Sequence, residues 1–398
     1  MTHTRRLFDE NSHLFDFTAT VLSVTPTDAP DTLRIVLDAT AFFPEGGGQS
    51  PDTGLLGGCP VLDVQETDGI IYHTVKTQVP FPAPGEAVEG HLDRDVRFRK
   101  MQNHSGEHVI SGIVHRLYGY TNVGFHLGNG DVTLDFDGVL SRQELNAIED
   151  EANRIVAACL PVKAYYPTPE VLSTLVYRSK LELTENVRMV EIGQGESMMD
   201  RCACCAPHVD NTGEIGVIKL LDFIHYKGGV RIHMLCGLDA LEDYRRRYTD
   251  VALLASRLSV KQEDLVTGFD RLTAEIEEKK QTIFDLRQTI LAMTLAALPE
   301  TDGSICLFEE TGDANAMRKL LNEAVKKCGK LCGVFSGNDE GGYRYVIGRR
   351  DTSIDLKQHN KEISAALNAK GGGSSEMLQG RASTTRMQIQ QFFSTFDT

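Results

Sequence analysis

The sequence contains two pairs of residues that commonly bind metals, and in each pair the two residues stand four positions apart. His104 and His108 lie in a segment with helical spacing, so their imidazoles project from one helix face about 6 Å apart. About a hundred residues later, Cys204 and His208 repeat this spacing. Either pair alone would fit ordinary core or surface residues, but three imidazoles and one thiolate favour Zn²⁺ over Mg²⁺ or Ca²⁺. The two pairs together predict one zinc ion per chain.

The choice of thiolate stays open at this point, because three cysteines crowd this segment. Cys205 lies three residues before His208 and Cys202 lies six before it. Helical spacing therefore selects Cys204 only where this turn is helical.

The first pair also fits a different class of zinc enzyme. The five residues from His104 to His108 spell H-x-x-E-H, the inverted zinc-peptidase motif in which the glutamate, here Glu107, is the general base. That motif needs a downstream acidic ligand and gives no role to Cys204 and His208. A metallopeptidase is therefore the alternative interpretation.

Two glycine triplets suit close approach to a ligand. Gly46, Gly47 and Gly48 precede Gln49, and a backbone without side chains lets a ligand or another chain come close; the alternative is a flexible hairpin tip. Near the C-terminus, a second triplet followed by two serines predicts either a loop of N–H groups suited to phosphate or a solvated linker. The second triplet is Gly371, Gly372 and Gly373.

The elements that must position these residues change in kind along the chain. Short β-rich segments between turns open the sequence, helical spacing begins near residue 98, and mixed strands and helices follow. We therefore predict an α+β protein of four segments. These are a small β-barrel with the first glycine triplet (1–96), an α+β domain with the metal-binding helix (97–245), a helical coiled-coil linker (246–300) and a small α/β domain with the second triplet in a loop (301–398).

The clearest periodic signal covers residues 265–293. Apolar residues recur there at alternating steps of four and three, interrupted only at Lys279. This heptad pattern predicts a long helix whose apolar face packs on a second subunit or on a returning helix of the same chain. Association into a homodimer through this region is one of the two interpretations.

Composition narrows the class further. The 398 residues exceed what one hydrophobic core usually serves, so we expect more than one domain. No apolar run approaches the roughly 20 residues of a membrane span, and the N-terminus shows no signal peptide, so we expect a cytoplasmic protein. Nine cysteines form no disulfide framework. The net charge of −15 argues against coating nucleic acid through bulk charge, and residues 301–398, with 13 basic and 12 acidic side chains, are the least repulsive part for a polyanion.

Taken in order, these motifs resemble the editing half of alanyl-tRNA synthetase and the free-standing alanyl-tRNA editing proteins, in their long form. The resemblance rests on the sequences FFPEGGGQ with DTG, NHSGEH, CCAPHV with TGEIG, and KGGVRI, and on the C-terminal GGGSSEMLQG. No segment corresponds to an adenylate-forming core, so the chain is not expected to charge tRNA. One departure stands out: the usual Cys-Gly-Gly-Thr-His is Cys204-Cys205-Ala206-Pro207-His208 here.

The resemblance implies hydrolysis of mischarged tRNA(Ala), chiefly the serine ester and also the glycine ester, at a zinc-containing site. A site that pairs with the serine hydroxyl rejects alanine strongly. Beyond the four metal ligands, the residues expected to act fall into three groups. They are Gln49, Thr53 and Glu107 for catalysis; Gly46, Gly47, Gly48, Thr121, Asn122, His126 and Arg231 for substrate contact; and Gly371, Gly372 and Gly373 for tRNA.

Overall fold

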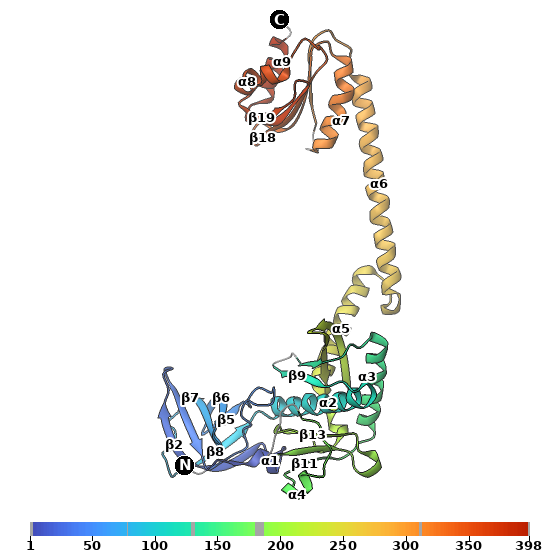
Figure 1. Ribbon diagram of the computed structural model, residues 1–398. Coiled ribbons are helices and arrows are strands. Elements are labelled where there is room, and N and C mark those ends of the chain that lie inside the picture. Colours follow the sequence, from blue (N-terminus) through green and yellow to red (C-terminus); the bar gives the residue numbers. More distant parts are fainter. Residues whose placement is uncertain (1–2, 78, 129–131, 180–186, 310–312, 397–398) are drawn as a thin grey trace. The chain divides into compact units, whose positions relative to one another are not determined.

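The computed structural model describes residues 3–77, 79–128, 132–179, 187–309 and 313–396, and its chain divides into two compact units, Met1–Leu253 and Leu254–Thr398. Both units combine helices with sheets, so the expected α+β class is confirmed (Figure 1). The division into four segments stays a prediction. No helix in the described part of the chain is long and apolar enough to cross a membrane.

The first unit begins with a ring of six strands, each hydrogen-bonded to the next, so that the sheet closes on itself. Along β7, every second side chain (Ile71, His73 and Val75) is buried, as expected of a strand with one face on a core. In ring order the strands are β2 (Asp16–Pro26), β3 (Thr32–Leu37), β7 (Ile70–Lys76), β6 (Cys59–Thr67), β5 (Gly54–Leu56) and β8 (Ala87–Leu92). Three short elements accompany the ring: β1 (Arg5–Arg6) and α1 (Leu7–Glu10) come before β2, and β4 (Ala39–Thr40), which pairs with β1, follows β3.

The predicted metal-binding helix exists as α2 (Arg94–Tyr118). Asp93 caps its N-terminus by accepting a hydrogen bond from the Val96 N–H, and Gly119 ends it in the left-handed conformation that glycine tolerates. Most side chains between Lys100 and Val114 are buried, because α2 packs against elements on several sides. The helix therefore holds its histidines inside the protein.

Two sheets and a second helix surround α2. One sheet has the order β14 (Ile218–Tyr226), β15 (Gly229–Cys236), β10 (Val132–Phe136), β9 (Asn122–Leu127); the other has the order β11 (Val162–Tyr165), β12 (Met189–Ile192), β13 (Asp200–Ala203). Helix α3 (Arg142–Ala157) starts with a capping box formed by Ser141 and Glu144. The short helix α4 (Pro169–Leu172) and the long helix α5 (Gly237–Leu258) complete this part.

The second unit contains a five-stranded sheet with apolar clusters on its two faces. One cluster includes side chains of α8 and α9 and the other includes side chains of α7. The strand order is β16 (Ile305–Phe308), β17 (Leu331–Asn338), β18 (Gly342–Arg349), β20 (Met377–Ala382), β19 (Ala369–Gly373). The helices are α6 (Leu265–Ala297), α7 (Ala314–Ala324), α8 (Leu356–Ala366) and α9 (Arg386–Thr395).

The second glycine triplet corrects one expectation. Gly371, Gly372 and Gly373 do not form a loop: they lie in the edge strand β19, paired in register with β20. A Cβ at Gly371 or Gly373 would stand 2.3 or 2.0 Å from a carbonyl oxygen of β20, so close strand contact explains these two glycines.

The heptad segment forms the predicted long helix, α6. Its apolar side chains at Phe269, Ile276, Ile283, Ile290 and Met293 are exposed in the single chain. The helix is therefore confirmed, and its pairing in a coiled coil stays a prediction.

Candidate metal centre

The four predicted ligands come together in the first unit. His104 and His108 project from α2, while Cys204 and His208 follow β13, and one potential ligand atom from each lies within 4.8 Å of the others. The Cys204 Sγ atom is 3.5 Å from His104 Nε2 and 3.4 Å from His208 Nε2. Zinc bonds of about 2.3 Å to sulfur and about 2.0–2.1 Å to nitrogen, at a tetrahedral angle, would separate these atoms by about 3.6 Å. The donor set and its spacing therefore fit a tetrahedral metal site.

The local backbone also answers which cysteine belongs to the cluster. The segment after β13 is not helical, so the helical premise for the spacing of Cys204 and His208 is wrong. Cys204 nevertheless faces the three histidines, whereas Cys202 lies within β13 and Cys205 faces the first glycine triplet. The four-residue spacing arises here from an irregular turn.

Two helix glycines let α2 approach the strands that carry the rest of the site. A Cβ at Gly106 would lie 2.3 Å from Cys236 Sγ on β15, and one at Gly112 would lie 3.0 Å from Asp200 Cβ on β13. Any side chain at Gly106 would therefore push the histidine helix away from β15. Neither glycine was predicted to matter, although two glycines inside a helical pattern signal close packing.

Burial sets the protonation of the ligands. Burial, together with the neighbouring His108 and His104, lowers the pKa of His208, so its imidazole is neutral, as a metal ligand must be. Burial also raises the pKa of the Cys204 thiol. The thiol would therefore release its proton on binding a metal cation.

Gln49 connects the glycine triplet to the cluster. Its Oε1 atom accepts a hydrogen bond from His104 Nδ1 at 2.8 Å, which leaves Nε2 as the nitrogen beside Cys204. The Gln49 side chain is 1% exposed, and its Nε2 atom has no partner among the described residues. A buried amide donor without a partner marks a place where a ligand could accept a hydrogen bond.

The glycine triplet forms a tight two-residue turn. Gly46 and Gln49 exchange backbone hydrogen bonds of 3.0 and 3.1 Å, and both Gly47 and Gly48 have positive φ, as a type I′ turn requires. A Cβ at Gly48 would lie 2.3 Å from the Phe125 carbonyl oxygen on β9. Gly48 is therefore required for close packing against β9, whereas a Cβ at Gly46 would make only ordinary contacts of 3.8–4.0 Å. Contact of this triplet with a ligand stays a prediction.

Helix α2 also holds this turn in place. Arg97 donates to the Asp52 carboxylate and to the carbonyls of Ser12 and Ala41, and Asp52 in turn accepts from the Phe43 N–H. Three residues further along the helix, the Lys100 ammonium donates to the carbonyls of Ser50 and Pro51. The same helix therefore positions the histidines and the residues on either side of Gln49.

A buried ion pair supports His108 from the other side. Arg178 and Asp200 form two hydrogen bonds of 2.7 Å, and Asp200 Oδ2 lies 3.4 Å from His108 Nδ1. Burial is the largest influence and raises the pKa of Asp200, but the hydrogen bonds and charges of Arg178 and His108 together outweigh it and lower the pKa. A carboxylate against a ligand imidazole is a common way to fix its orientation, and neither residue was predicted from the sequence.

Glu107 lies closer to the cluster than its helix position suggests. Successive helix residues point about 100° apart, yet Glu107 Oε2 is 3.7 Å from His108 Nε2. Glu107 Oε1 accepts from Ser111 at 2.7 Å and from Asn122 at 2.5 Å. Asn122 also donates to Ser111 and accepts from Gly124, so it orients Glu107, which gives no support to a contact with substrate.

The other predicted substrate residues contact other groups. Thr53 is exposed, and its carbonyl accepts from the Asp93 N–H; Thr121 and His126 are also exposed. Arg231 pairs with Asp135 through two hydrogen bonds of 2.6 and 2.7 Å. Their roles toward substrate remain predictions.

Comparison with known families and proteins agrees with this geometry. Residues 9–96 match the family described as tRNA synthetases class II (A), and residues 187–233 match the threonyl and alanyl tRNA synthetase second additional domain. The second match includes Cys204 and His208.

Similar whole proteins fall into two groups. The alanyl-tRNA editing protein AlaX-L of Pyrococcus horikoshii is 25% identical, with 96% of each chain covered. The alanine–tRNA ligases of Ignicoccus hospitalis and Pyrobaculum neutrophilum are 27% and 30% identical over 93% and 96% of this chain, which spans only 40% and 43% of their length. The chain thus resembles an alanyl-tRNA editing protein along almost its whole length. It spans only about two fifths of the length of the ligases.

Proposed function

We propose that this chain, which resembles the alanyl-tRNA editing proteins almost from end to end, is a hydrolase that cleaves the ester between a wrongly attached amino acid and tRNA(Ala). The observation that supports this most is the 2.8 Å hydrogen bond between Gln49 and His104, because it joins the glycine turn and the ligand cluster into one site. We expect it to act in the cytoplasm, where aminoacyl-tRNA is used. A metallopeptidase is not favoured, because among the described residues the cluster contains Cys204 and His208 and no acidic ligand.

Zinc is the metal that this donor set favours. His104, His108, Cys204 and His208 would hold one ion, and the measured S···N separations suit tetrahedral coordination. With all four side chains bound, zinc would polarise the ester carbonyl or hold the amino group of the substrate only as a fifth ligand, so it would orient more than activate.

Two buried side chains beside the cluster act on the ester. The free Nε2–H of Gln49 donates a hydrogen bond to the carbonyl oxygen, where negative charge grows during attack by water. Glu107 accepts the proton from the attacking water and returns it to the ribose oxygen when the bond from the carbonyl carbon to that oxygen breaks, and Ser111 and Asn122 hold its carboxylate in place. An ester on a ribose needs far less assistance than an amide, so these two groups suffice beside the metal.

Serine is the chief amino acid removed, and glycine is the second. A polar pocket that pairs with the serine hydroxyl leaves a buried group unpaired when alanine binds, which costs about 1–3 kcal/mol or more. Glycine has no side chain, so it leaves room for a water molecule to pair with that group instead. Correct Ala-tRNA(Ala) therefore escapes hydrolysis.

The second unit supplies affinity for the tRNA phosphates through a row of cations. Arg344, Arg381 and Lys370 stand directly opposite one another on β18, β20 and β19, and all three are exposed. Like charges in register destabilise a sheet, so such a row suits a polyanionic partner. Two adjoining hollows of about 560 and 550 Å³ share Arg381 and Ser383 along this row. Gly371, Gly372 and Gly373 adjoin the row on β19, and their contact with tRNA is part of this proposal.

The exposed apolar face of α6 pairs with a second copy of the chain. Phe269, Ile276, Ile283 and Ile290 follow the heptad spacing and are exposed in the single chain. Burying them against the same face of another subunit would remove a long apolar stripe from water. The protein would then act as a homodimer.

Four charged tRNAs test this function. The full chain is mixed in turn with Ser-tRNA(Ala), Gly-tRNA(Ala), Ala-tRNA(Ala) and Ser-tRNA(Ser), and release of each amino acid is followed. We expect rapid loss of serine and slower loss of glycine from tRNA(Ala), with the other two spared. Equal hydrolysis of Ser-tRNA(Ser) would contradict selection of tRNA(Ala), and no hydrolysis of any ester would contradict the function itself.

A further inference from the structure

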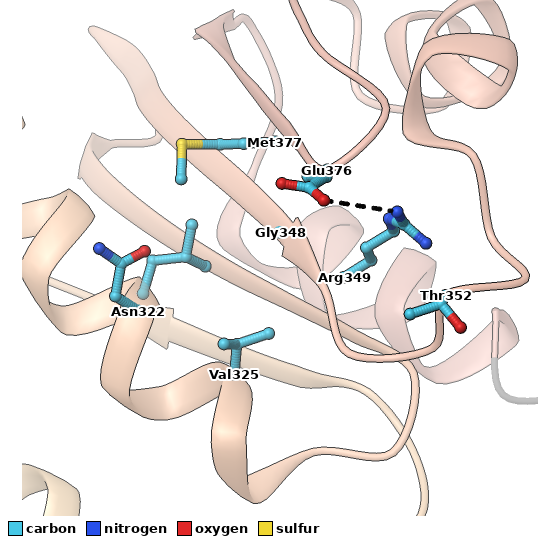
Figure 2. Close-up of a pocket in the computed structure, with 8 residues that line it drawn as sticks. Asn322, Val325, Gly348, Arg349, Thr352, Glu376 and Met377 are labelled. Atoms are coloured by element: carbon cyan, nitrogen blue, oxygen red, sulfur yellow. Dashed lines mark ion pairs between the residues drawn. The ribbon is translucent and has the colours of Figure 1, made fainter.

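The second unit contains a pocket that the ester-hydrolysing site does not use. It has a volume of about 270 Å³ and lies where the end of α7 meets β18 and the start of β20 (Figure 2). All its lining residues belong to this unit: Leu321, Asn322, Val325, Gly348, Arg349, Thr352, Glu376 and Met377.

One wall of the pocket is apolar. Leu321, Val325 and Met377 present aliphatic and thioether groups from three different elements. Gly348 lets α7 come close to β18, since a Cβ there would already lie 3.2 Å from Leu321 Cδ2. This wall suits an apolar body and gives it no hydrogen-bond partner.

The opposite wall carries a guanidinium with weak partners. The Arg349 side chain is only 14% exposed, yet its buried Nε atom has no hydrogen-bond partner in the described part of the chain. Two other contacts of this side chain are long: 3.4 Å from Nη1 to the Asp351 carbonyl and 3.8 Å from Nη2 to Glu376. A buried guanidinium normally has short, charge-assisted hydrogen bonds, so this one lacks a close acceptor, above all at Nε.

The acidic neighbours do not supply that acceptor. The Glu376 side chain is 77% exposed and stands at the rim beside Arg349 (Figure 2). The Asp351 carboxylate accepts from the Ser353 N–H at 2.8 Å instead. An incoming anion could therefore displace Glu376 into water and take the donors of Arg349.

We propose that this pocket binds a small phosphate or carboxylate carried on an apolar body, with Arg349 holding the oxyanion and the apolar wall holding the body. The planar fork of arginine matches two oxygens of either group. The oxyanion could come from a free metabolite or from an RNA phosphate, and the site is separate from the cation row of Arg344, Arg381 and Lys370.

Phenyl phosphate is the probe, and calorimetric titration of the full chain is the measurement. We expect phenyl phosphate to bind more tightly than inorganic phosphate, because only the former reaches the apolar wall. Arg349→Met should lower the affinity for phenyl phosphate at least about tenfold. The matched control Arg350→Met, at the exposed neighbouring cation, should leave it unchanged.

A surface variant keeps the test valid where Arg349→Met fails to fold. Glu376→Gln removes the competing carboxylate at an exposed position, so affinity for phenyl phosphate should rise several-fold. Release of the probe by added tRNA would identify RNA as the source of the anion, and retention of the probe would identify a free small molecule; both outcomes support the site. Equal binding of the two phosphates, or an unchanged affinity in Glu376→Gln, would overturn the proposal.

Discussion

Replacing Gln49 separates metal binding from action on the ester. Gln49→Leu keeps nearly the same volume but removes both polar atoms, so the His104 Nδ1–H loses its acceptor in a site where both side chains are buried. An unsatisfied buried donor costs about 1–3 kcal/mol. Loss of a hydrogen bond to a ligand imidazole typically weakens metal affinity about 10- to 100-fold, which corresponds to about 1.4–2.7 kcal/mol. The two estimates agree, and we expect a loss in this range.

Gln49→Glu gives the complementary result. Its carboxylate still accepts from His104, so zinc affinity should equal or exceed that of the wild type. It has no amide N–H, however, so the hydrogen bond that we assign to the ester carbonyl is lost. Removing one such donor lowers the rate about 10²- to 10³-fold in a well-studied hydrolase.

The assay combines zinc titration against a competing chelator with single-turnover deacylation of Ser-tRNA(Ala) at full metal occupancy. We expect Gln49→Leu to lose both metal affinity and rate, and Gln49→Glu to lose rate alone. Unchanged zinc affinity in Gln49→Leu would refute the orienting role. An unchanged rate in Gln49→Glu would refute the role of the Nε2–H group.

Four further changes test other parts of the structure. Metal analysis should show loss of zinc in Cys204→Ala and full zinc in Cys59→Ala, which replaces a buried cysteine of the strand ring. Full zinc in Cys204→Ala would exclude the Cys204 thiolate as a ligand. Arg381→Gln should weaken tRNA binding and reduce its salt slope by about 1, and an unchanged slope would contradict the phosphate contact. Burial lowers the pKa of His73 from 6.5 to about 4, so on acidification the unfolded chain protonates this imidazole before the folded chain does. The free energy of unfolding should therefore fall by up to about 3 kcal/mol as the pH drops from 6.5 to 4. Urea titrations of His73→Gln should lack this loss. Ile283→Glu on α6 should convert a dimer into a monomer in sedimentation, and an unchanged mass would contradict pairing through this face.

Much of the fold follows from local signals in the sequence. The capping box at Ser141 and the heptads after Leu265 identify helices because they reflect interactions within one or two turns. The loop predicted for the glycines at 371–373 is wrong, since the same residue type serves a loop and a crowded edge strand. Only the register with β20 distinguishes the two.

The candidate site divides in the same way. The four ligands share types and spacing that zinc sites use, so the sequence identifies them. Arg178 and Asp200 carry no such pattern, because they act through a bidentate pair between distant segments. Glu107 could not be placed beside His108 from helix geometry alone, since its long side chain reaches beyond the direction of its Cα–Cβ bond.

Single-turnover hydrolysis of Ser-tRNA(Ala) and Ala-tRNA(Ala), by the wild type and by Cys204→Ala, tests the central claim most directly. The account predicts that the wild type releases serine at least about a hundred times faster than alanine and that Cys204→Ala loses the serine activity. Equal release of serine and alanine by the wild type, or full serine release by Cys204→Ala, would contradict it.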